Sequence, residues 1–159
     1  SSITGRASMK SHVLIVCSGG GHWVQMKRLL PAFEGLIVSV ATVELSCLRS
    51  CDFTFNSEVQ IPDFNRKNPR SIVAFFFRAV SILFSLKPTH VVSTGAAPGL
   101  VMLFVARLMG CKVLWIDSIA NTKKLSMSGR VACYFASAVF TQWGHLDGKH
   151  GARFVGRVI

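Results

Sequence analysis

An apolar run that leads into three consecutive glycines limits the possible folds of this chain more than any other feature. Val13 to Val16 is rich in β-branched residues and carries no charge, which is typical of a buried strand. Gly19, Gly20 and Gly21 follow, and residues 22–33 then have helical character. Glycine has no Cβ, so such a turn lets the backbone approach a ligand closely. The pattern predicts a strand, a tight turn and a helix whose N-terminus faces the space beyond the strand.

The same alternation of apolar runs and helical segments continues along the chain. Strands of near-continuous apolar character, separated by helices, are typical of a parallel sheet covered on both faces. The sequence therefore predicts an α/β fold, a Rossmann-like, doubly wound parallel sheet. The expected strands are 12–17, 36–42, 53–61, 89–93, 112–116, 138–142 and 153–158, and the expected helices are 22–33, 44–51, 71–86, 98–109 and 128–137.

The length of 159 residues has room for one domain with a substantial core and hardly for two. Residues 9–159 are therefore interpreted as a single domain. Residues 1–8 have no apolar pattern and precede Met9, so they are interpreted as the remnant of an expression tag.

Polar or glycine-rich loops follow three of the predicted strands, at 18–22, 94–97 and 117–118. The carboxyl ends of parallel strands meet at one edge of the sheet, where doubly wound folds bind their ligands. A helix N-terminus behind the glycines adds unpaired N–H groups and a positive dipole end, which suit a phosphate or diphosphate. His22 stands at the mouth of this anion site and can move a proton near neutral pH. The expected diphosphate-binding residues are Ser18, Gly19, Gly20, Gly21, Thr94, Gly95 and Ala96, and the expected catalytic residues are His22 and Asp117.

Other interpretations of these residues stay open. Gly19 and Gly21 fit the first two positions of the dinucleotide-binding pattern G-x-G-x-x-G, but Val24 occupies the third. Glu44 stands about 20 residues further on, where an acid that binds ribose is expected. NAD(P) binding and a tight turn without a ligand are therefore alternatives. Asp117 follows an apolar strand, where it can cap the next segment, bind substrate hydroxyls or act as a general base beside the anion site.

The charge balance favours anionic partners. Lys and Arg number 18 against seven Asp and Glu, which gives a net charge of +11. Such a surface attracts acidic lipid headgroups, phosphorylated substrates or nucleic acid. The basic residues are not interleaved with aromatic ones in a nucleic-acid-binding motif, so nucleic acid is not expected as a partner. Cys47 and Cys51 share a helical face but have no second pair of ligands, so neither a metal site nor a cofactor is expected.

The helix expected at 71–86 is strongly apolar, and basic residues lie at both of its ends. Its aromatic residues form a wide face, and small or polar residues recur along one narrow stripe. A buried core helix explains this pattern. A helix that lies in a bilayer interface, where cations meet acidic headgroups, explains it as well. The residues expected to bind the membrane are Arg66, Lys67, Arg70, Phe75, Phe76 and Arg78.

Several short stretches, in this order and spacing, together form a specific pattern over residues 9–159. They are Ser18 to His22 with Gln25-Met26, Lys87-Pro88, Ser93 to Ala96, Trp115 to Ser118, Leu125 to Arg130, Gln142-Trp143 and Phe154 to Gly156. Through them the chain resembles a family of glycosyltransferase subunits. The chain is similar to the bacterial PssD-type polysaccharide-biosynthesis proteins and to the membrane-anchoring subunit of the eukaryotic dolichol-pathway N-acetylglucosaminyltransferase. It is also similar to the N-terminal half of MurG-like GT-B enzymes. The family usually has Glu where this chain has Asp117, and Arg where Asn121 stands.

The resemblance implies the N-terminal, acceptor-binding half of an inverting, metal-independent GT-B glycosyltransferase. The complete enzyme would transfer a sugar, such as glucuronic acid or N-acetylglucosamine, from a UDP-sugar to a prenyl-diphosphate-linked saccharide. His22 would be the base and Asp117 would bind acceptor hydroxyls. A PssE-like subunit would bind the donor, and the pair would attach peripherally to acidic lipids at the cytoplasmic face of the inner (plasma) membrane. A non-catalytic scaffold that recruits the catalytic subunit is the alternative.

Overall fold

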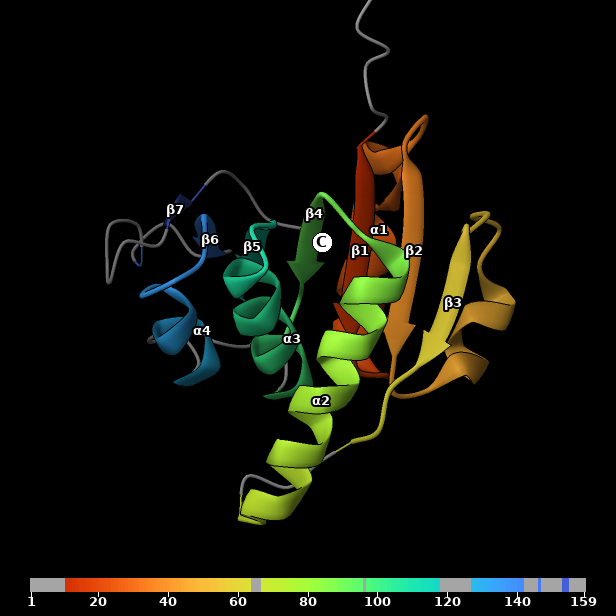
Figure 1. Ribbon diagram of the computed structural model, residues 1–159. Helices are drawn as coiled ribbons and strands as arrows, with labels where there is room; N and C mark the ends of the chain where they lie inside the picture. The colour runs from red at the N-terminus through yellow and green to blue at the C-terminus, as the bar shows by residue number, and fades with distance from the viewer. Residues whose placement is uncertain are drawn as a thin grey trace, which may run out of the picture.

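The fold is a seven-stranded parallel sheet with helices on both faces, which confirms the predicted architecture (Figure 1). The computed structural model describes residues 11–63, 67–95, 97–117, 127–141, 146 and 153–154, so residues 1–8 lie outside the described part. The strands are β1 (His12–Cys17), β2 (Ile37–Thr42), β3 (Ser57–Gln60), β4 (His90–Ser93), β5 (Lys112–Ile116), β6 (Ala138–Thr141) and β7 (Arg153–Phe154).

The strand order is β3-β2-β1-β4-β5-β6-β7, and every neighbouring pair is parallel. The chain therefore starts near the middle of the sheet, builds outward to β3 and then crosses back to place β4 beside β1. The helices are α1 (Gly21–Leu29), η1 (Leu30–Phe33), η2 (Leu45–Ser50), α2 (Pro69–Leu86), α3 (Ala97–Leu108) and α4 (Met127–Ala132), of which η1 and η2 are 3-10 helices.

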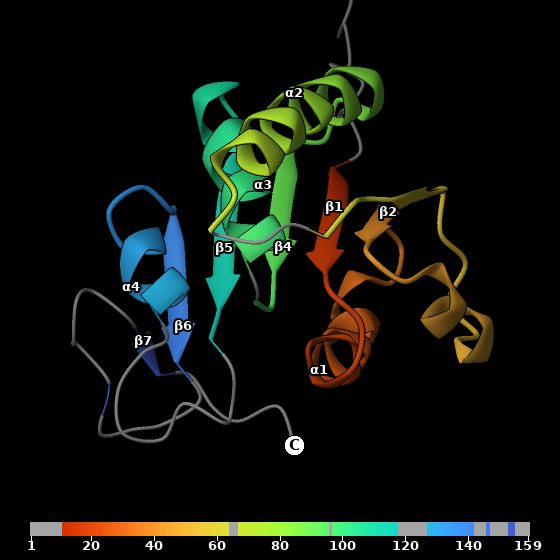
Figure 2. The ribbon, with the colours of Figure 1, turned by 90° about the horizontal axis from the view of Figure 1, so that it is seen from below.

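Two apolar cores lie on the two faces of the sheet, because neighbouring residues of a strand point to opposite sides. In β1, Leu14 and Val16 belong to one core, whereas Ile15 and Cys17 belong to the other. Helices α2 and α3 cover the first core, and α4 packs against α3 and β5. Helix α1 and η2 cover the second core, on the opposite face (Figure 2).

Prolines set two helix boundaries that differ from the expected ones. The helix expected at 22–33 is α only as far as Leu29 and then continues as η1, which has Pro31 in its first turn. Proline lacks an N–H group and its ring clashes with the preceding helical turn, so the α-helix ends there. Helix α2 begins at Pro69, two residues earlier than expected. The Asn68 side chain accepts a hydrogen bond from the Arg70 N–H at 3.2 Å and caps this start.

The segment between β2 and β3 also differs from the expected pattern. Strand β3 is short, and the residues expected to extend it pack their aromatic rings under α1 instead. The ring centroids of Phe53 and Phe55 lie 5.2 Å apart, and those of Trp23 and Phe55 lie 6.4 Å apart. Helix α4 is likewise shorter than the predicted 128–137, since it ends at Ala132.

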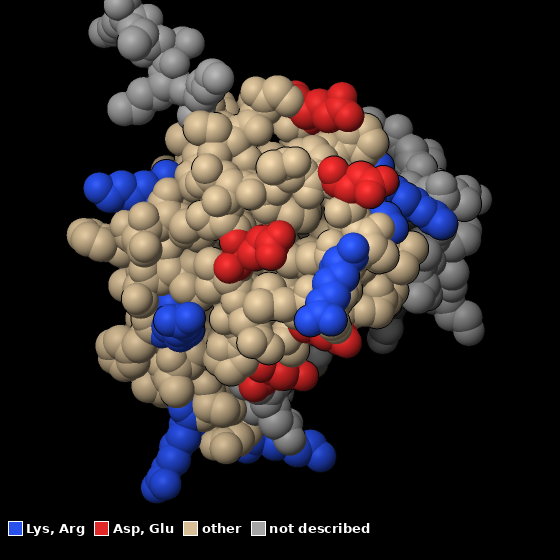
Figure 3. All heavy atoms as spheres, turned by 90° about the vertical axis from the view of Figure 1, so that its right-hand side faces the viewer, with Lys and Arg blue, Asp and Glu red and all other residues tan. Residues whose placement is uncertain are grey.

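Charge is distributed unevenly over the molecule. Of the seven acidic residues, the five that lie before α2 are all exposed and follow one another from Glu34 to Asp63. This segment forms the β2–β3 edge, where acidic and basic side chains mix (Figure 3). Helices α2 and α3 have no acidic residue at all. The outer surface of these two helices therefore carries only positive charge.

Candidate functional site

The loops after β1 and β4 meet at the carboxyl edge of the sheet. Strands β1 and β4 are direct neighbours, although β2, β3 and α2 separate them in the chain. The winding of the sheet changes direction between them, and at such a point doubly wound folds bind their ligands. The structure thus brings together the two glycine-containing loops that the sequence analysis placed at this edge. Ala96 lies outside the described residues.

The glycine turn leaves the N-terminus of α1 open. Gly20 has a φ of +67°, in the left-handed region that favours glycine. The first hydrogen bond of α1 runs from the Val24 N–H to the Gly20 carbonyl at 3.1 Å, so the preceding N–H groups have no acceptor within the helix. Gly20 and Gly21 are exposed, and a Cβ added to either would meet no other group within 4 Å. This end of α1 can receive an anion.

His22 is hydrogen-bonded to the loop after β4. Its Nδ1 atom lies 3.2 Å from the carbonyl oxygen of Thr94, and the Thr94 hydroxyl donates to the His22 carbonyl oxygen at 2.8 Å. The His22 ring also packs against Gly95. The imidazole is half-buried, whereas Thr94 and Gly95 are buried. A titratable ring is therefore held at the point where the two loops meet.

A carboxylate lies on the other side of the glycine turn. A Cβ added to Gly19 would collide with Oε2 of Glu44, and Oε1 of the same side chain accepts a hydrogen bond from the Ser46 hydroxyl at 2.9 Å. Like charges repel, so a diphosphate fits better at Gly20 and the start of α1 than at Gly19. Val24, at the third position of the dinucleotide pattern, is 48% exposed.

The end of β1, directly before the glycine turn, carries no charge. Cys17 ends β1 and is buried there. The pKa of its thiol is raised to about 12, mainly by burial and secondly by the neighbouring Cys47, while a hydrogen bond with Thr42 acts in the opposite direction. All five cysteines of the chain are free thiols. The Cys17 thiol stays protonated at neutral pH and does not act as a nucleophile.

Asp117 occupies the predicted place at the end of β5, but its side chain is only 2% exposed. One carboxylate oxygen accepts a hydrogen bond from the Trp115 indole N–H at 3.1 Å, and the Asp117 N–H bonds the Phe140 carbonyl at 2.8 Å. Burial, with the charge of Asp117 as a second cause, raises the pKa of the nearby Cys133 thiol. This environment favours the structural interpretation of Asp117 that the sequence left open. Ser118 and Asn121 lie outside the described residues.

Helix α2 has one face buried in the core and another face with exposed apolar side chains, so it has features of both the core helix and the interfacial helix that its sequence allowed. Phe75 was expected to bind the membrane, but it is 1% exposed and packs in the core with Ala79, Ile82 and Leu83. Phe76 is half-buried against the same core. The residues that are exposed instead are Val73 at 54%, Phe77 at 68% and Phe84 at 70%. The sequence held a signal for them, because they adjoin the narrow stripe of small and polar residues, of which Ala74, Arg78, Ser81 and Ser85 are exposed.

Of the basic residues expected at the membrane, Arg70 and Arg78 lie on α2, and Lys67 lies just before it. Lys67, Arg70 and Arg78 are exposed, and Arg66 lies outside the described residues. By length and composition α2 is the one helix of the described residues that could cross a membrane. Its packed face, which joins it to the sheet, is that of a core helix.

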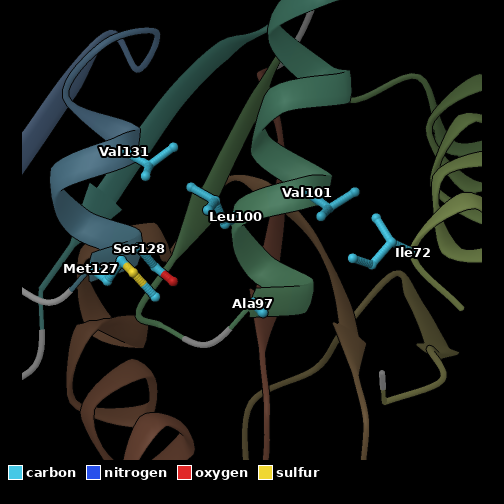
Figure 4. A pocket seen from close by; sticks show the side chains of 7 residues that line it. All are labelled: Ile72, Ala97, Leu100, Val101, Met127, Ser128 and Val131. Carbon is cyan, nitrogen blue, oxygen red and sulfur yellow. The ribbon is translucent and has the colours of Figure 1, made fainter. Parts of the chain in front are cut away.

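An apolar pocket of about 280 Å³ lies around the first turn of α3 (Figure 4). Leu100 points toward Val131 of α4, and Val101 points toward Ile72 of α2. Ala97 and Met127 line the pocket at the N-terminal ends of α3 and α4. Helix N-termini follow the carboxyl ends of the strands, so the pocket lies at the same edge of the sheet as the glycine turn.

Sequence comparison places this chain among proteins of oligosaccharide biosynthesis. Residues 34–158 match the family described as "Oligosaccharide biosynthesis protein Alg14 like". The UDP-N-acetylglucosamine transferase subunit ALG14 of Eremothecium gossypii is 28% identical over 179 residues, which cover 93% of this chain and 80% of that protein.

Solved structures share the fold. MurG of Acinetobacter baumannii matches with a TM-score of 0.76 and 17% identity, over 92% of this chain and 45% of that one. The UDP-GlcNAc 2-epimerase of Neisseria meningitidis, bound to UDP-GlcNAc, matches with a TM-score of 0.71 and 11% identity, over 92% of this chain and 47% of that one. The chain spans about half the length of these structures, and its fold is that of the N-terminal half of a GT-B glycosyltransferase. Because the family match covers most of its residues, the chain belongs to the Alg14-like family of oligosaccharide biosynthesis proteins.

Proposed function

We propose that the chain is the acceptor-binding subunit of a two-chain glycosyltransferase. The complete enzyme transfers a sugar, such as N-acetylglucosamine or glucuronic acid, from a UDP-sugar to a prenyl-diphosphate-linked saccharide. The relative from Eremothecium gossypii, a subunit of a UDP-N-acetylglucosamine transferase, supports this class of reaction. The observation that carries the proposal is the placement of His22 between two loops at the switch point of the sheet, beside the open N-terminus of α1.

The site offers separate groups to the two ends of such an acceptor. The N–H groups and the positive dipole end at Gly20 and Gly21 receive the diphosphate. His22 lies at the next residue along the helix, so its imidazole is close to the sugar that follows the diphosphate. In this proposal Ser18, Thr94 and Gly95 shape the same cleft.

The chemistry is a single displacement with inversion. The imidazole of His22 takes the proton of the acceptor hydroxyl as that oxygen attacks the anomeric carbon of the donor sugar. The bond between the anomeric carbon and the UDP oxygen breaks, and UDP leaves with the electron pair. In this proposal Asp117 stabilises the end of β5 through its bonds to the Trp115 indole and the Phe140 carbonyl.

A second subunit supplies the donor site. The chain spans 45% of the MurG chain that it matches, and its fold corresponds to the N-terminal half of such a GT-B enzyme. A PssE-like chain that binds the UDP-sugar would complete the cleft. The carboxyl edge of the sheet, where His22 lies, would then face that subunit.

Helix α2 holds the subunit at the membrane surface in this proposal. Val73, Phe77 and Phe84 insert among acyl chains, while Arg70 and Arg78 meet acidic headgroups. The attachment is peripheral and lies on the cytoplasmic face, where UDP-sugars are available. The apolar pocket at the start of α3 lies at the edge of the sheet where the prenyl chain leaves the diphosphate, and Ile72 connects it to the exposed residues of α2.

Replacing His22 separates a catalytic subunit from a scaffold. With the partner subunit present, His22→Ala is expected to lower the rate of sugar transfer by about 10²–10⁴-fold, the usual contribution of a general base. His90→Ala is the matched control, since His90 starts β4 at the opposite edge of the sheet. A loss of less than about threefold for His22→Ala would leave the scaffold as the better account.

A further inference from the structure

The ring of His22 is held in one orientation by the loop after β4. The Thr94 carbonyl oxygen lies 3.2 Å from Nδ1, and the Thr94 hydroxyl fixes the backbone of His22 by a bond of 2.8 Å to its carbonyl oxygen. A carbonyl oxygen can only accept a hydrogen bond. The Nδ1 atom of the neutral ring must therefore carry the proton, which leaves Nε2 as the atom with a free lone pair.

We propose that Thr94 and Gly95 are positioning residues that hold His22 in the Nδ1–H tautomer and so make Nε2 the atom that receives the acceptor proton. The inference rests on the proposed function for the identity of the proton donor, but the tautomer itself depends only on the contacts of the ring. Neutral histidine free in water favours the opposite, Nε2–H form. The protein therefore has to select the form that the chemistry needs.

Gly95 allows this position of the His22 ring because it has no side chain. A Cβ at this position would overlap Cε1 and Nδ1 of His22, so only glycine lets the ring come close enough to reach the Thr94 carbonyl. Gly95 also has a φ of +152°, which residues with a side chain rarely adopt. The ring contact and the backbone conformation thus impose the same residue.

Gly99 stabilises this arrangement indirectly, through Ser93. The Ser93 hydroxyl accepts a hydrogen bond from the Gly95 N–H at 3.3 Å and donates one to the Gly95 carbonyl at 3.4 Å. A Cβ at Gly99, in the first turn of α3, would overlap this hydroxyl. Gly99 leaves room for Ser93, Ser93 fixes Gly95, and Gly95 admits the ring. A loop that served only as a phosphate cradle would need none of these contacts with His22.

The tautomer can be measured directly on the full chain. Nitrogen-15 chemical shifts of the histidine rings distinguish protonated from unprotonated ring nitrogens, and His22→Gln assigns the His22 signals. In the neutral ring of His22, we expect the proton to be on Nδ1. A predominant Nε2–H form, or an equal mixture of both forms, would overturn the inference.

Two variants test the role of Gly95. Gly95→Ala is expected to abolish the preference for Nδ1–H and, with the partner present, to lower kcat by about ten- to hundred-fold, because a shift of the base by about 1 Å is that costly. Gly110→Ala is the matched control: Gly110 has a φ of +87°, but a Cβ there would meet open space. It imposes backbone strain without touching His22 and should leave the tautomer unchanged. If Gly95→Ala retained the Nδ1–H form, Gly95 would have no positioning role.

A second, milder variant keeps the test informative if the Gly95→Ala protein does not fold. Ser93→Ala removes the hydroxyl that fixes Gly95 and adds no atoms. It should raise the share of the Nε2–H form, and an unchanged share would contradict the role of Ser93. The tautomer measurements do not depend on the proposed function. An Nδ1–H tautomer together with full activity of His22→Ala would refute the role of His22 as base while leaving its positioning by Thr94 and Gly95 intact.

Discussion

Helices α1 and α2 pack on opposite faces of the same sheet and differ in what they expose. Helix α1 buries Trp23 and Met26 and exposes Lys27 and Arg28, which water solvates readily. Helix α2 is twice as long and buries one stripe around Phe75, but its outer surface also carries large apolar side chains. The exposed apolar residues of α2 are Val73, Phe77 and Phe84, and those of α3 are Phe104 and Leu108.

This difference fits separate roles for the α1 face and the α2–α3 face of the sheet. Apart from Val24, the exposed residues of α1 are glycine or basic residues, as on a helix that faces water. The outer surface of α2 and α3 is apolar, and its charges are all basic, which fits an acidic lipid surface. In the proposed function, the end of α1 binds the polar head of the acceptor, and α2 binds the membrane from which the acceptor extends. Four measurements can break or sharpen this comparison.

The largest effect is expected from the contrast between two neighbouring phenylalanines of α2. Phe75→Ala removes a fully buried ring and should lower the free energy of unfolding by about 3–5 kcal/mol. Phe77→Ala removes a ring that is 68% exposed and should change it by less than about 0.5 kcal/mol. Urea titration of both variants measures the difference. Equal losses would mean that α2 has no separate outer surface.

Membrane attachment should depend on α2 and not on α1. Phe77→Ser combined with Phe84→Ser is expected to weaken binding to vesicles of acidic lipid at least about tenfold, because burying one such ring contributes about 1.5–3 kcal/mol. Val24→Ser combined with Leu36→Ser is the matched control, since both side chains are exposed and lie outside α2, Val24 on α1 and Leu36 just before β2. Flotation assays would contradict the account if the control pair weakened binding as much.

The uncharged end of β1 predicts a pH dependence of stability. The thiol of Cys17 has a pKa of about 12 in the folded chain against an ordinary value of 9.0, so above pH 9 the unfolded chain has lost a proton that the folded chain keeps. The free energy of unfolding should therefore fall with rising pH, by about 1.4 kcal/mol per pH unit between these values. Cys17→Ala should lack this part of the slope. Identical slopes for the two proteins would show that Cys17 is not buried as described.

The smallest effect concerns the two exposed glycines at the start of α1. Gly21→Ala should raise the free energy of unfolding by about 0.4–1 kcal/mol, because alanine favours the helix and meets open space there. Gly20→Ala should instead lower it, by about 1 kcal/mol or more, because of the positive φ. Thermal unfolding distinguishes the two signs. A stabilised Gly21→Ala protein that no longer binds a prenyl diphosphate would show that this glycine serves the ligand and not the fold.

The sheet and the position of the site could be predicted because they follow from simple periodicity. Apolar runs separated by helices specify a parallel sheet, and a parallel sheet gathers the loops after β1 and β4 at one edge. The reciprocal bonds between His22 and Thr94 then follow from the adjacency of β1 and β4, which the chain order alone does not reveal.

Other details depend on packing that the sequence does not express. Three consecutive phenylalanines, residues 75–77, give no periodic contrast, so only the fold decides that Phe75 is buried and Phe77 exposed. The environment of Asp117 depends on the Trp115 indole N–H, which needs an acceptor inside the core. The end of α1, by contrast, could have been predicted from Pro31, although the helix was expected to continue to residue 33.

Reconstitution of sugar transfer tests the central claim most directly. The purified chain, acidic vesicles that contain a prenyl-diphosphate-linked saccharide, and a panel of UDP-sugars would be combined with and without the donor-binding subunit. We predict binding to the vesicles but no transfer by the chain alone, and transfer when the second subunit is added. Sugar transfer by the chain alone would contradict the account.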